Sequence, residues 1–195
     1  MTAPMIVRIA LFGPSGAGKS TTGRLIAQRC QVAKVEFHRL SLAEPLYHAQ
    51  TEIYRLARRP LEDPHVQDAE LLAVLGQQMR RINPSALIDD FSDRLQVLLA
   101  RVRSRSGRHI ILCDDMRYHD WKALEQLQFV PVKIFATPED CADRRRMRGD
   151  ISSVSGIPWS EQGLDGITPA HTLANTGSLD DLAVAIERLF EELFI

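Results

Sequence analysis

The chain is short of cysteine and carries no excess charge of either sign. Its three cysteines, Cys30, Cys113 and Cys141, are odd in number and far apart, and none belongs to a C-x-x-C pair. This pattern argues against a disulfide framework and a cysteine zinc site, and it predicts free thiols in a reducing, cytoplasmic compartment. With a net charge of −1, the chain has no general attraction to polymeric nucleic acid or to an anionic membrane.

Long hydrophobic runs, repeats and low-complexity tracts are also missing. The apolar run at residues 6–12 contains Arg8 and is far too short to span a bilayer. Residues 1–4 lack the charged segment that opens a signal peptide, so we expect neither secretion nor a membrane span. A chain of 195 residues that is 45% hydrophobic is long enough for one core. We expect a single domain over residues 1–195, as a monomer or a homodimer.

The strongest signal is Gly13-Pro14-Ser15-Gly16-Ala17-Gly18-Lys19-Ser20, which fits the phosphate-binding pattern G-x-x-x-x-G-K-[ST]. A strand-like run precedes it and a helical pattern follows, so its backbone N–H groups and the helix N-terminus would form an anion site. Lys19 is expected to reach the β- and γ-phosphates of ATP, and Ser20 to ligate Mg²⁺. The alternative, a glycine-rich turn that binds nothing, is disfavoured by the complete consensus. The residues expected to hold the nucleotide are Gly13, Ser15, Gly16, Ala17, Gly18, Lys19, Ser20 and Thr21.

Strand-like and helical segments alternate along the chain. Strands are expected at residues 6–12, 34–38, 109–113, 130–136 and 171–174, with helical patterns between them and after the last one. This alternation predicts an α/β fold in which a parallel sheet of about five strands has helices on both faces, the three-layer architecture of P-loop NTPases. Ligands of such sheets bind at the carboxyl ends of the strands, where the phosphate loop already lies.

Three helix starts have capping signals. Asn83 is predicted to be an N-cap with Pro84 at the first helical position, and Thr137 and Ser178 are predicted to cap two later helices. The apolar side of an earlier helix, which ends near residue 59, is assigned to Leu46, Ile53 and Leu56.

Two carboxylates, Asp114 and Asp115, end the buried strand at residues 109–113. A P-loop enzyme keeps its second magnesium-orienting carboxylate at such a position, so either aspartate is a candidate metal group. The alternative is a plain turn at the strand end, because aspartate favours turns. No Asp-Glu pair and no second signature of a transporter or motor ATPase follows, which argues against ATP hydrolysis as the main activity.

Arginines form the second group of candidates. Transfer between two phosphate groups requires neutralisation of the acceptor and of the transition-state charge, and the guanidinium fork can do both. Arg80 and Arg117 lie at predicted element ends, and Arg144 and Arg148 border a long aperiodic stretch at residues 149–169. We expect residues 144–169 to form a lid that excludes water. The alternative for each arginine is a solvated surface position.

Two further residue types give weaker signals. Trp159 lies in the expected lid, where it can stack on a base or anchor a hinge on the body. The histidines His38, His48, His65 and His119 are scattered singly, a pattern more typical of surface or core positions than of catalysis.

Taken together, these motifs resemble the bacteriophage-type deoxynucleoside monophosphate kinases within the nucleoside monophosphate kinase group. The resemblance spans nearly the whole chain, and only the phosphate loop is individually specific. The matching segments are residues 13–20, Leu42-Ala43-Glu44-Pro45-Leu46, Leu75-Gly76, Arg80-Arg81-Ile82-Asn83-Pro84, Asp115-Met116-Arg117-Tyr118, residues 160–165 and Asn175-Thr176-Gly177-Ser178-Leu179.

This resemblance implies ATP- and Mg²⁺-dependent phosphorylation of a (deoxy)nucleoside monophosphate to its diphosphate. It implies a helical acceptor-binding region at about residues 40–106, with Arg80 and Arg117 on the acceptor phosphate. It also implies that Asn175 lies near the donor adenine. Glu44 stands where the family usually has aspartate, which leaves the base and sugar preference open.

The sequence is also compatible with two other functions. A small-metabolite kinase of the same fold would phosphorylate a hydroxyl and need a carboxylate base, for which Asp115 or Glu44 could serve. A regulatory module would bind ATP without transferring its phosphate, but such a module has no need of an arginine-bordered lid.

Overall fold

The computed structural model describes residues 3–63, 66–148 and 163–194, and its strands form one parallel sheet with the order β2-β3-β1-β4-β5. The strands are β1 Met5–Phe12, β2 Glu36–Arg39, β3 Arg108–Cys113, β4 Val130–Phe135 and β5 His171–Ala174. All five lie within two residues of the segments expected from the sequence. The α/β prediction is confirmed, with β1 at the centre of the sheet.

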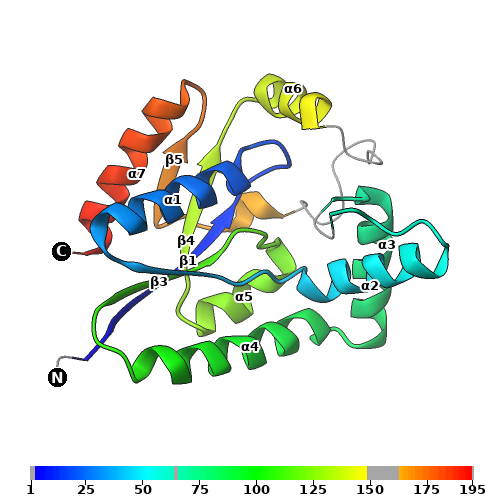
Figure 1. The fold of residues 1–195 in the computed structure, drawn as a ribbon. Coiled ribbons are helices and arrows are strands. Elements are labelled where there is room, and N and C mark those ends of the chain that lie inside the picture. The colour runs from blue at the N-terminus through cyan, green and yellow to red at the C-terminus, as the bar shows by residue number, and fades with distance from the viewer. Residues whose placement is uncertain (1–2, 64–65, 149–162, 195) are drawn as a thin grey trace.

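Helices cover both faces of this sheet in the described residues (Figure 1). The helices are α1 Lys19–Ala33, α2 Glu44–Leu56, α3 Ala69–Ile82, α4 Ala86–Arg103, α5 Tyr118–Gln126, α6 Pro138–Arg148 and α7 Leu179–Leu193, with the short 3-10 helix η2 at Leu164–Gly166. Helices α1 and α7 pack on one face of the sheet, and α4 and α5 pack on the other. No helix among the described residues is long and apolar enough to cross a membrane.

Strand β1 divides its side chains between the two layers because successive residues of a strand point to opposite faces. Ile9 and Leu11 join the core beneath α1 and α7, whereas Ala10 and Phe12 join the core beneath α4 and α5. All four are fully buried. A central strand covered on both sides in this way holds the loop that follows Phe12 at a fixed place on the sheet edge.

Two of the three predicted caps are confirmed. Ser178 forms a complete capping box at the start of α7, and Thr137 Oγ1 accepts the Asp140 N–H at 3.1 Å at the start of α6. The third is wrong by two residues, since α4 begins at Ala86. Asn83 ends α3 instead, and its side-chain oxygen accepts the Ser85 N–H at 3.1 Å, which builds a turn before α4 rather than a cap.

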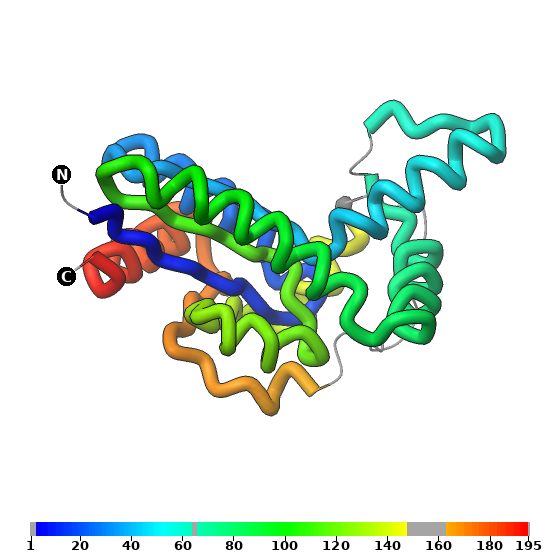
Figure 2. The backbone as a smooth tube through the Cα atoms, turned by 90° about the horizontal axis from the view of Figure 1, so that it is seen from below, coloured from blue at the N-terminus to red at the C-terminus, as the bar shows by residue number. Residues whose placement is uncertain are grey.

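Helices α2 and α3 project from the sheet as a hairpin, at the end of the molecule opposite the two termini (Figure 2). Leu46 is buried, but Ile53 and Leu56 are 38% and 66% exposed, so the apolar side predicted for this helix holds only for its first turn. The buried inward position is taken by the polar Gln50, which donates to Val66 O at 2.7 Å and accepts from the Asp68 N–H at 3.0 Å. The hairpin is therefore joined internally by polar contacts.

The segment predicted to be a lid is divided by the structure. Leu164 and Ile167 are 8% and 3% exposed and belong to the core beneath α4 and α5. Gly163, with φ of 84°, lies against the Tyr118 ring, where an added Cβ would stand 2.7 Å from the ring. Residues 163–169 are thus part of the body, and the predicted lid at residues 149–162 lies outside the described residues.

Candidate active site

The phosphate loop lies between β1 and α1, and neighbouring groups leave no room for side chains at two of its glycines. Gly16 has φ of 87°, and a Cβ there would stand 2.3 Å from Cys141 O of α6. Gly18 has φ of 102°, and a Cβ there would stand 2.2 Å from the Asn175 side-chain nitrogen. Both positions therefore need glycine for conformation and for space.

Lys19 and Ser20 stand where the motif predicts. The Lys19 ammonium donates to Gly13 O at 2.7 Å and to Pro14 O at 3.1 Å, so it reaches back across the loop that would receive phosphate. Ser20 is exposed at the start of α1 and lines a cleft. A cation held against two loop carbonyls, above left-handed glycines at a helix N-terminus, fits a polyphosphate ligand.

Side chains from two distant segments support the outer side of this loop. Asn175, which is 5% exposed, donates its amide to Ala17 O at 2.7 Å. Arg144 donates to Asn175 O at 2.9 Å and lies 3.4 Å from Gly16 O. Arg145, which the sequence did not single out, donates to Ser15 O at 2.7 Å. The turn after β5 and helix α6 thus both contact the backbone of the phosphate loop.

Two other predicted residues cannot be placed in the same way. The side chain of Arg148, at the end of α6, lies outside the described part of the chain, and so does Trp159. Their predicted roles in the lid and in base stacking stay predictions.

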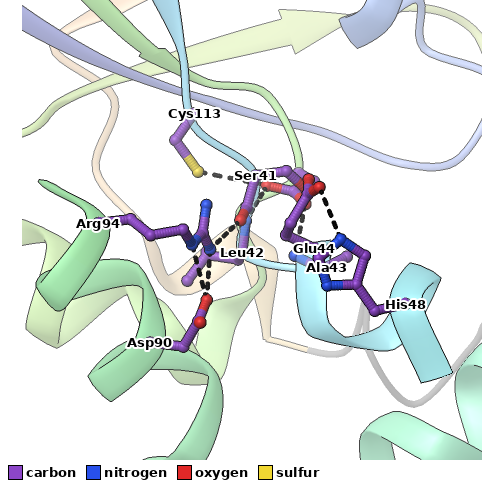
Figure 3. Close-up of polar contacts among 9 residues, drawn as sticks. Ser41, Leu42, Ala43, Glu44, His48, Asp90, Arg94 and Cys113 are labelled. Carbon is purple, nitrogen blue, oxygen red and sulfur yellow. Dashed lines mark hydrogen bonds and ion pairs between the residues drawn. The ribbon is translucent and has the colours of Figure 1, made fainter. Parts of the chain in front are cut away.

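The two aspartates at the end of β3 have different surroundings. Asp115 accepts three hydrogen bonds from the turn that leads into α2: from Ser41 Oγ at 2.5 Å, and from the N–H groups of Leu42 and Ala43 at 2.9 Å each. Figure 3 shows Ser41, Leu42 and Ala43 gathered at this point, with Cys113 beside them. Asp115 is therefore occupied in anchoring the β2–α2 turn.

Arg94 of α4 also holds this turn. Its guanidinium donates to Ser41 O at 2.7 Å and to Asp90 at 2.6 Å, as Figure 3 shows. Helix α4 and the end of β3 thus fix the start of α2 from two sides.

Asp114 faces α1 instead. Its Oδ2 lies 3.5 Å from the point where a Cβ of Gly23 would stand, and Gly23 is one turn along α1 from Ser20. Oδ1 accepts from Arg39 Nε at 2.9 Å. Burial raises the pKa of this carboxyl group above its usual range, although the hydrogen bond from Arg39 acts in the opposite direction. Of the two predicted metal groups, Asp114 is therefore the one that faces α1, at a position one turn from Ser20.

A cleft of about 370 Å³ opens next to Ser20. Its lining residues are Ser20, Arg39, Ser41, Glu44, Tyr47 and Gln67. Tyr47 accepts from the Gln67 side chain at 2.7 Å, and burial raises its pKa. The positive charges of Arg39 and Arg117 act against this rise in the pKa of Tyr47. The cleft therefore combines the phosphate-loop serine with the Arg39 guanidinium group and the Glu44 carboxylate.

Four of these residues, Arg39, Ser41, Tyr47 and Gln67, were missed from the sequence. Arg39 ends β2, and a residue at the carboxyl end of a parallel strand is a recognisable signal for a ligand position. Tyr47 and Gln67 carry no such signal. Tyr47 lies within a helix, Gln67 lies in the segment before α3, and only folding of the α2–α3 hairpin brings them together.

Arg80 has an established partner. Its terminal nitrogen Nη2 donates to both carboxylate oxygens of Asp120 at 3.0 Å, and the two side chains are 15% and 6% exposed. Burial raises the pKa of Asp120, although the Arg80 charge opposes that shift. This buried pair joins α3 to α5, so Arg80 attaches the hairpin to the body. Its predicted contact with the acceptor phosphate stays a prediction.

Comparison with known proteins adds a fold relationship. No protein-family model and no curated protein matches the sequence. Among solved structures, TT1252 from Thermus thermophilus has 21% identity and a TM-score of 0.57, with all of both chains covered. The Mycobacterium tuberculosis APS kinase CysC in complex with AMPPNP and APS has 20% identity and a TM-score of 0.54 over 96% of this chain and 99% of that one. The chain therefore has the three-layer α/β fold of P-loop kinases.

Proposed function

We propose that this chain is a kinase that transfers a phosphoryl group from ATP to a (deoxy)nucleoside monophosphate and forms the diphosphate. The observation that carries the proposal is the cleft beside Ser20, because the guanidinium group of Arg39 lines it next to the phosphate loop. An acceptor that already bears a phosphate needs such groups, since two highly charged reactants must be brought together.

The donor half uses the phosphate loop. Its backbone N–H groups and Lys19 would bind the triphosphate, and Ser20 with Asp114 would hold Mg²⁺, Asp114 acting through water. When bound, Mg²⁺ neutralises charge on the β- and γ-phosphate oxygens. Arg144 lies against the loop carbonyls and adds a second cation at the same edge. No protein nucleophile is required for this reaction.

The acceptor half uses the cleft and its rim. Arg117 and Arg39 supply planar guanidinium forks that match the oxygens of a monophosphate. Arg39 is held by Asp114, and its side chain is 56% exposed, so it can exchange that partner for a phosphate. Glu44 and Tyr47 line the cleft where the sugar or base would lie.

A second candidate is a kinase of the same fold that phosphorylates a hydroxyl. The Glu44 carboxylate favours it, because this group lines the cleft and could accept a hydroxyl proton. One solved structure of this fold is an APS kinase in complex with AMPPNP and APS, which is consistent with an acceptor other than a nucleoside monophosphate on the same scaffold.

A coupled assay for ADP release tests both candidates. Purified protein with ATP and Mg²⁺ would be offered ribo- and deoxynucleoside monophosphates, and in parallel the matching phosphate-free nucleosides and APS. The proposal expects turnover with at least one monophosphate and none with its nucleoside. Faster turnover of an acceptor through its hydroxyl would replace the proposal with the second candidate. ATP binding without any ADP release would identify a regulatory module.

A further inference from the structure

Three polar residues with metal-ligating atoms meet at the end of the sheet far from the phosphate loop. Glu36 and His38 lie on the same face of the edge strand β2, two residues apart, and His109 of β3 pairs in register with Glu36. His109 is also in register with Ile6 of β1, six residues before Phe12 and the phosphate loop. At roughly 3.3 Å per residue, the cluster lies about 20 Å from that loop.

The three ligand atoms form a triangle of a definite size. His38 Nε2 and His109 Nδ1 are 3.5 Å apart, and Glu36 Oε2 lies 3.9 Å from the first and 3.6 Å from the second. The circle through these atoms has a radius of about 2.1 Å, which equals the usual distance from zinc to an imidazole nitrogen or a carboxylate oxygen. One ion can therefore reach all three atoms without movement of the backbone.

Hydrogen bonding alone accounts poorly for this arrangement. Two of the three separations are longer than a hydrogen bond, and the third is at its outer limit. His109 is fully buried, and within the described residues its other nitrogen, Nε2, has no partner. The ring thus directs only Nδ1 at polar groups, and its one hydrogen bond, with His38 Nε2, is at the outer limit of distance. A buried polar side chain in this condition is costly unless a ligand lies between the partners.

We propose that Glu36, His38 and His109 bind one divalent transition-metal ion of the zinc class. Two imidazole nitrogens and one carboxylate oxygen suit such an ion and do not suit Mg²⁺, which prefers oxygen ligands in octahedral geometry. The Glu36 and His38 side chains are 44% and 22% exposed, so the ion can enter from solvent and keep a water as its fourth ligand. The ion fastens the four-residue edge strand β2 to β3, and it takes no part in phosphoryl transfer.

One neighbouring cation competes for this site. Arg105, just beyond α4, donates to Glu36 Oε2 at 3.1 Å, and its side chain is 61% exposed. On metal binding this arginine must move to the other carboxylate oxygen or into solvent. Its removal by Arg105→Gln therefore leaves zinc affinity unchanged or higher, and weaker binding in this variant would overturn the proposal.

Titration calorimetry with zinc chloride tests the site directly. The full chain would be stripped with a chelator and then titrated in excess Mg²⁺, which occupies any magnesium site at the phosphate loop. We expect one equivalent of zinc to bind with a dissociation constant below about 10 µM. His38→Gln and Glu36→Gln should each weaken binding by at least about tenfold, since even groups behind a metal ligand have effects of that size. His109 is not substituted because it is fully buried. Its replacement would disturb folding, and weaker zinc binding would then say nothing about the site.

A matched control and a spectroscopic readout complete the experiment. His171, on the opposite edge strand, pairs with Glu192 at 2.8 Å, and the described residues place no second histidine in a metal-binding group with it, so His171→Gln should bind zinc like the wild type. Co²⁺ should give a visible absorption band in the wild type that is lost in His38→Gln, with circular dichroism confirming the fold of every variant. Equal zinc binding by the wild type and His38→Gln, or a thiolate charge-transfer band with Co²⁺, would overturn the proposal.

Discussion

The donor and acceptor halves that we propose for the active site are built in different ways. The donor half is a backbone loop enclosed by β1, α6 and the turn after β5. Hydrogen bonds from neighbouring elements support it, such as the buried one from Asn175 to Ala17 O. The acceptor half is a projecting hairpin of α2 and α3 on which Leu56, Val74 and Ile82 are 66%, 50% and 80% exposed. A few polar anchors hold it: Asp115 at the β2–α2 turn and the Arg80–Asp120 pair.

This difference has a functional consequence. A preformed backbone loop suits the phosphate ligand that proteins with this loop share. A hairpin attached by side chains can change in sequence, and so in acceptor specificity, without loss of the donor site. We therefore expect substitutions in the donor half to act on turnover or ATP binding, and substitutions of the anchors to act on the acceptor's KM. The following experiments are ordered from the largest expected effect to the smallest.

Lys19→Ala should have the largest effect. It removes the cation that lies across the phosphate loop, and loss of such transition-state charge stabilisation lowers turnover by on the order of 10²–10³. Steady-state kinetics would measure the loss, with circular dichroism as the check on folding. Lys122→Ala, at an exposed position of α5, is the matched control and should behave like the wild type. Turnover near the wild-type value in Lys19→Ala would remove the phosphate loop from the mechanism.

Asp114→Asn and Asp115→Asn separate the metal group from the anchor. Asp114→Asn should lower kcat by about ten- to a hundredfold and raise the Mg²⁺ concentration needed for half-maximal rate. Asp115→Asn should leave the Mg²⁺ requirement unchanged, raise the acceptor's KM and cost about 1–3 kcal/mol of stability, because charge-assisted hydrogen bonds to the β2–α2 turn are lost. Magnesium titrations and chemical denaturation give these numbers. The reverse pattern would make Asp115 the metal group.

The phosphate loop was recognisable in the sequence, whereas the contacts that the α2–α3 hairpin makes were not, for a physical reason. Phosphate binding by a backbone loop demands glycines and a lysine at fixed spacing, so Gly16, Gly18 and Lys19 are recognisable before the chain folds. Asp114 and Asp115 differ in their surroundings because only Asp115 contacts the β2–α2 turn. No local sequence pattern predicts which of the two makes this contact. The His38–His109 contact was missed for the same cause, since residues 71 apart in the chain meet only through strand pairing.

Arg117→Lys tests the acceptor half more narrowly. A lysine keeps the charge but loses the planar fork, so activity toward the monophosphate should fall by about ten- to a hundredfold. The KM for ATP should change far less. Kinetics with each substrate varied separately would measure both, and Arg145→Lys at the donor loop is the comparison, with the acceptor's KM expected to stay constant. Weaker ATP binding with an unchanged acceptor KM in Arg117→Lys would move Arg117 to the donor site.

Asn175→Ala should have the smallest effect. It removes one hydrogen bond to Ala17 O and leaves the loop's glycines and lysine in place. A net loss of about 1 kcal/mol predicts roughly fivefold weaker ATP binding, with acceptor binding unchanged. Fluorescence or calorimetric titration with ATP would detect this change. A much larger loss would mean that Asn175 contacts the nucleotide itself, as the family resemblance implies.

Transfer of labelled phosphate tests directly whether the protein phosphorylates the phosphate group of a nucleoside monophosphate. The wild-type protein would be incubated with γ-³²P-labelled ATP, Mg²⁺ and the best monophosphate found in the ADP assay, and the labelled product would be identified by chromatography. We expect a nucleoside diphosphate that carries the label on its new β-phosphate. Label on a hydroxyl of the acceptor, or only on inorganic phosphate, would contradict it.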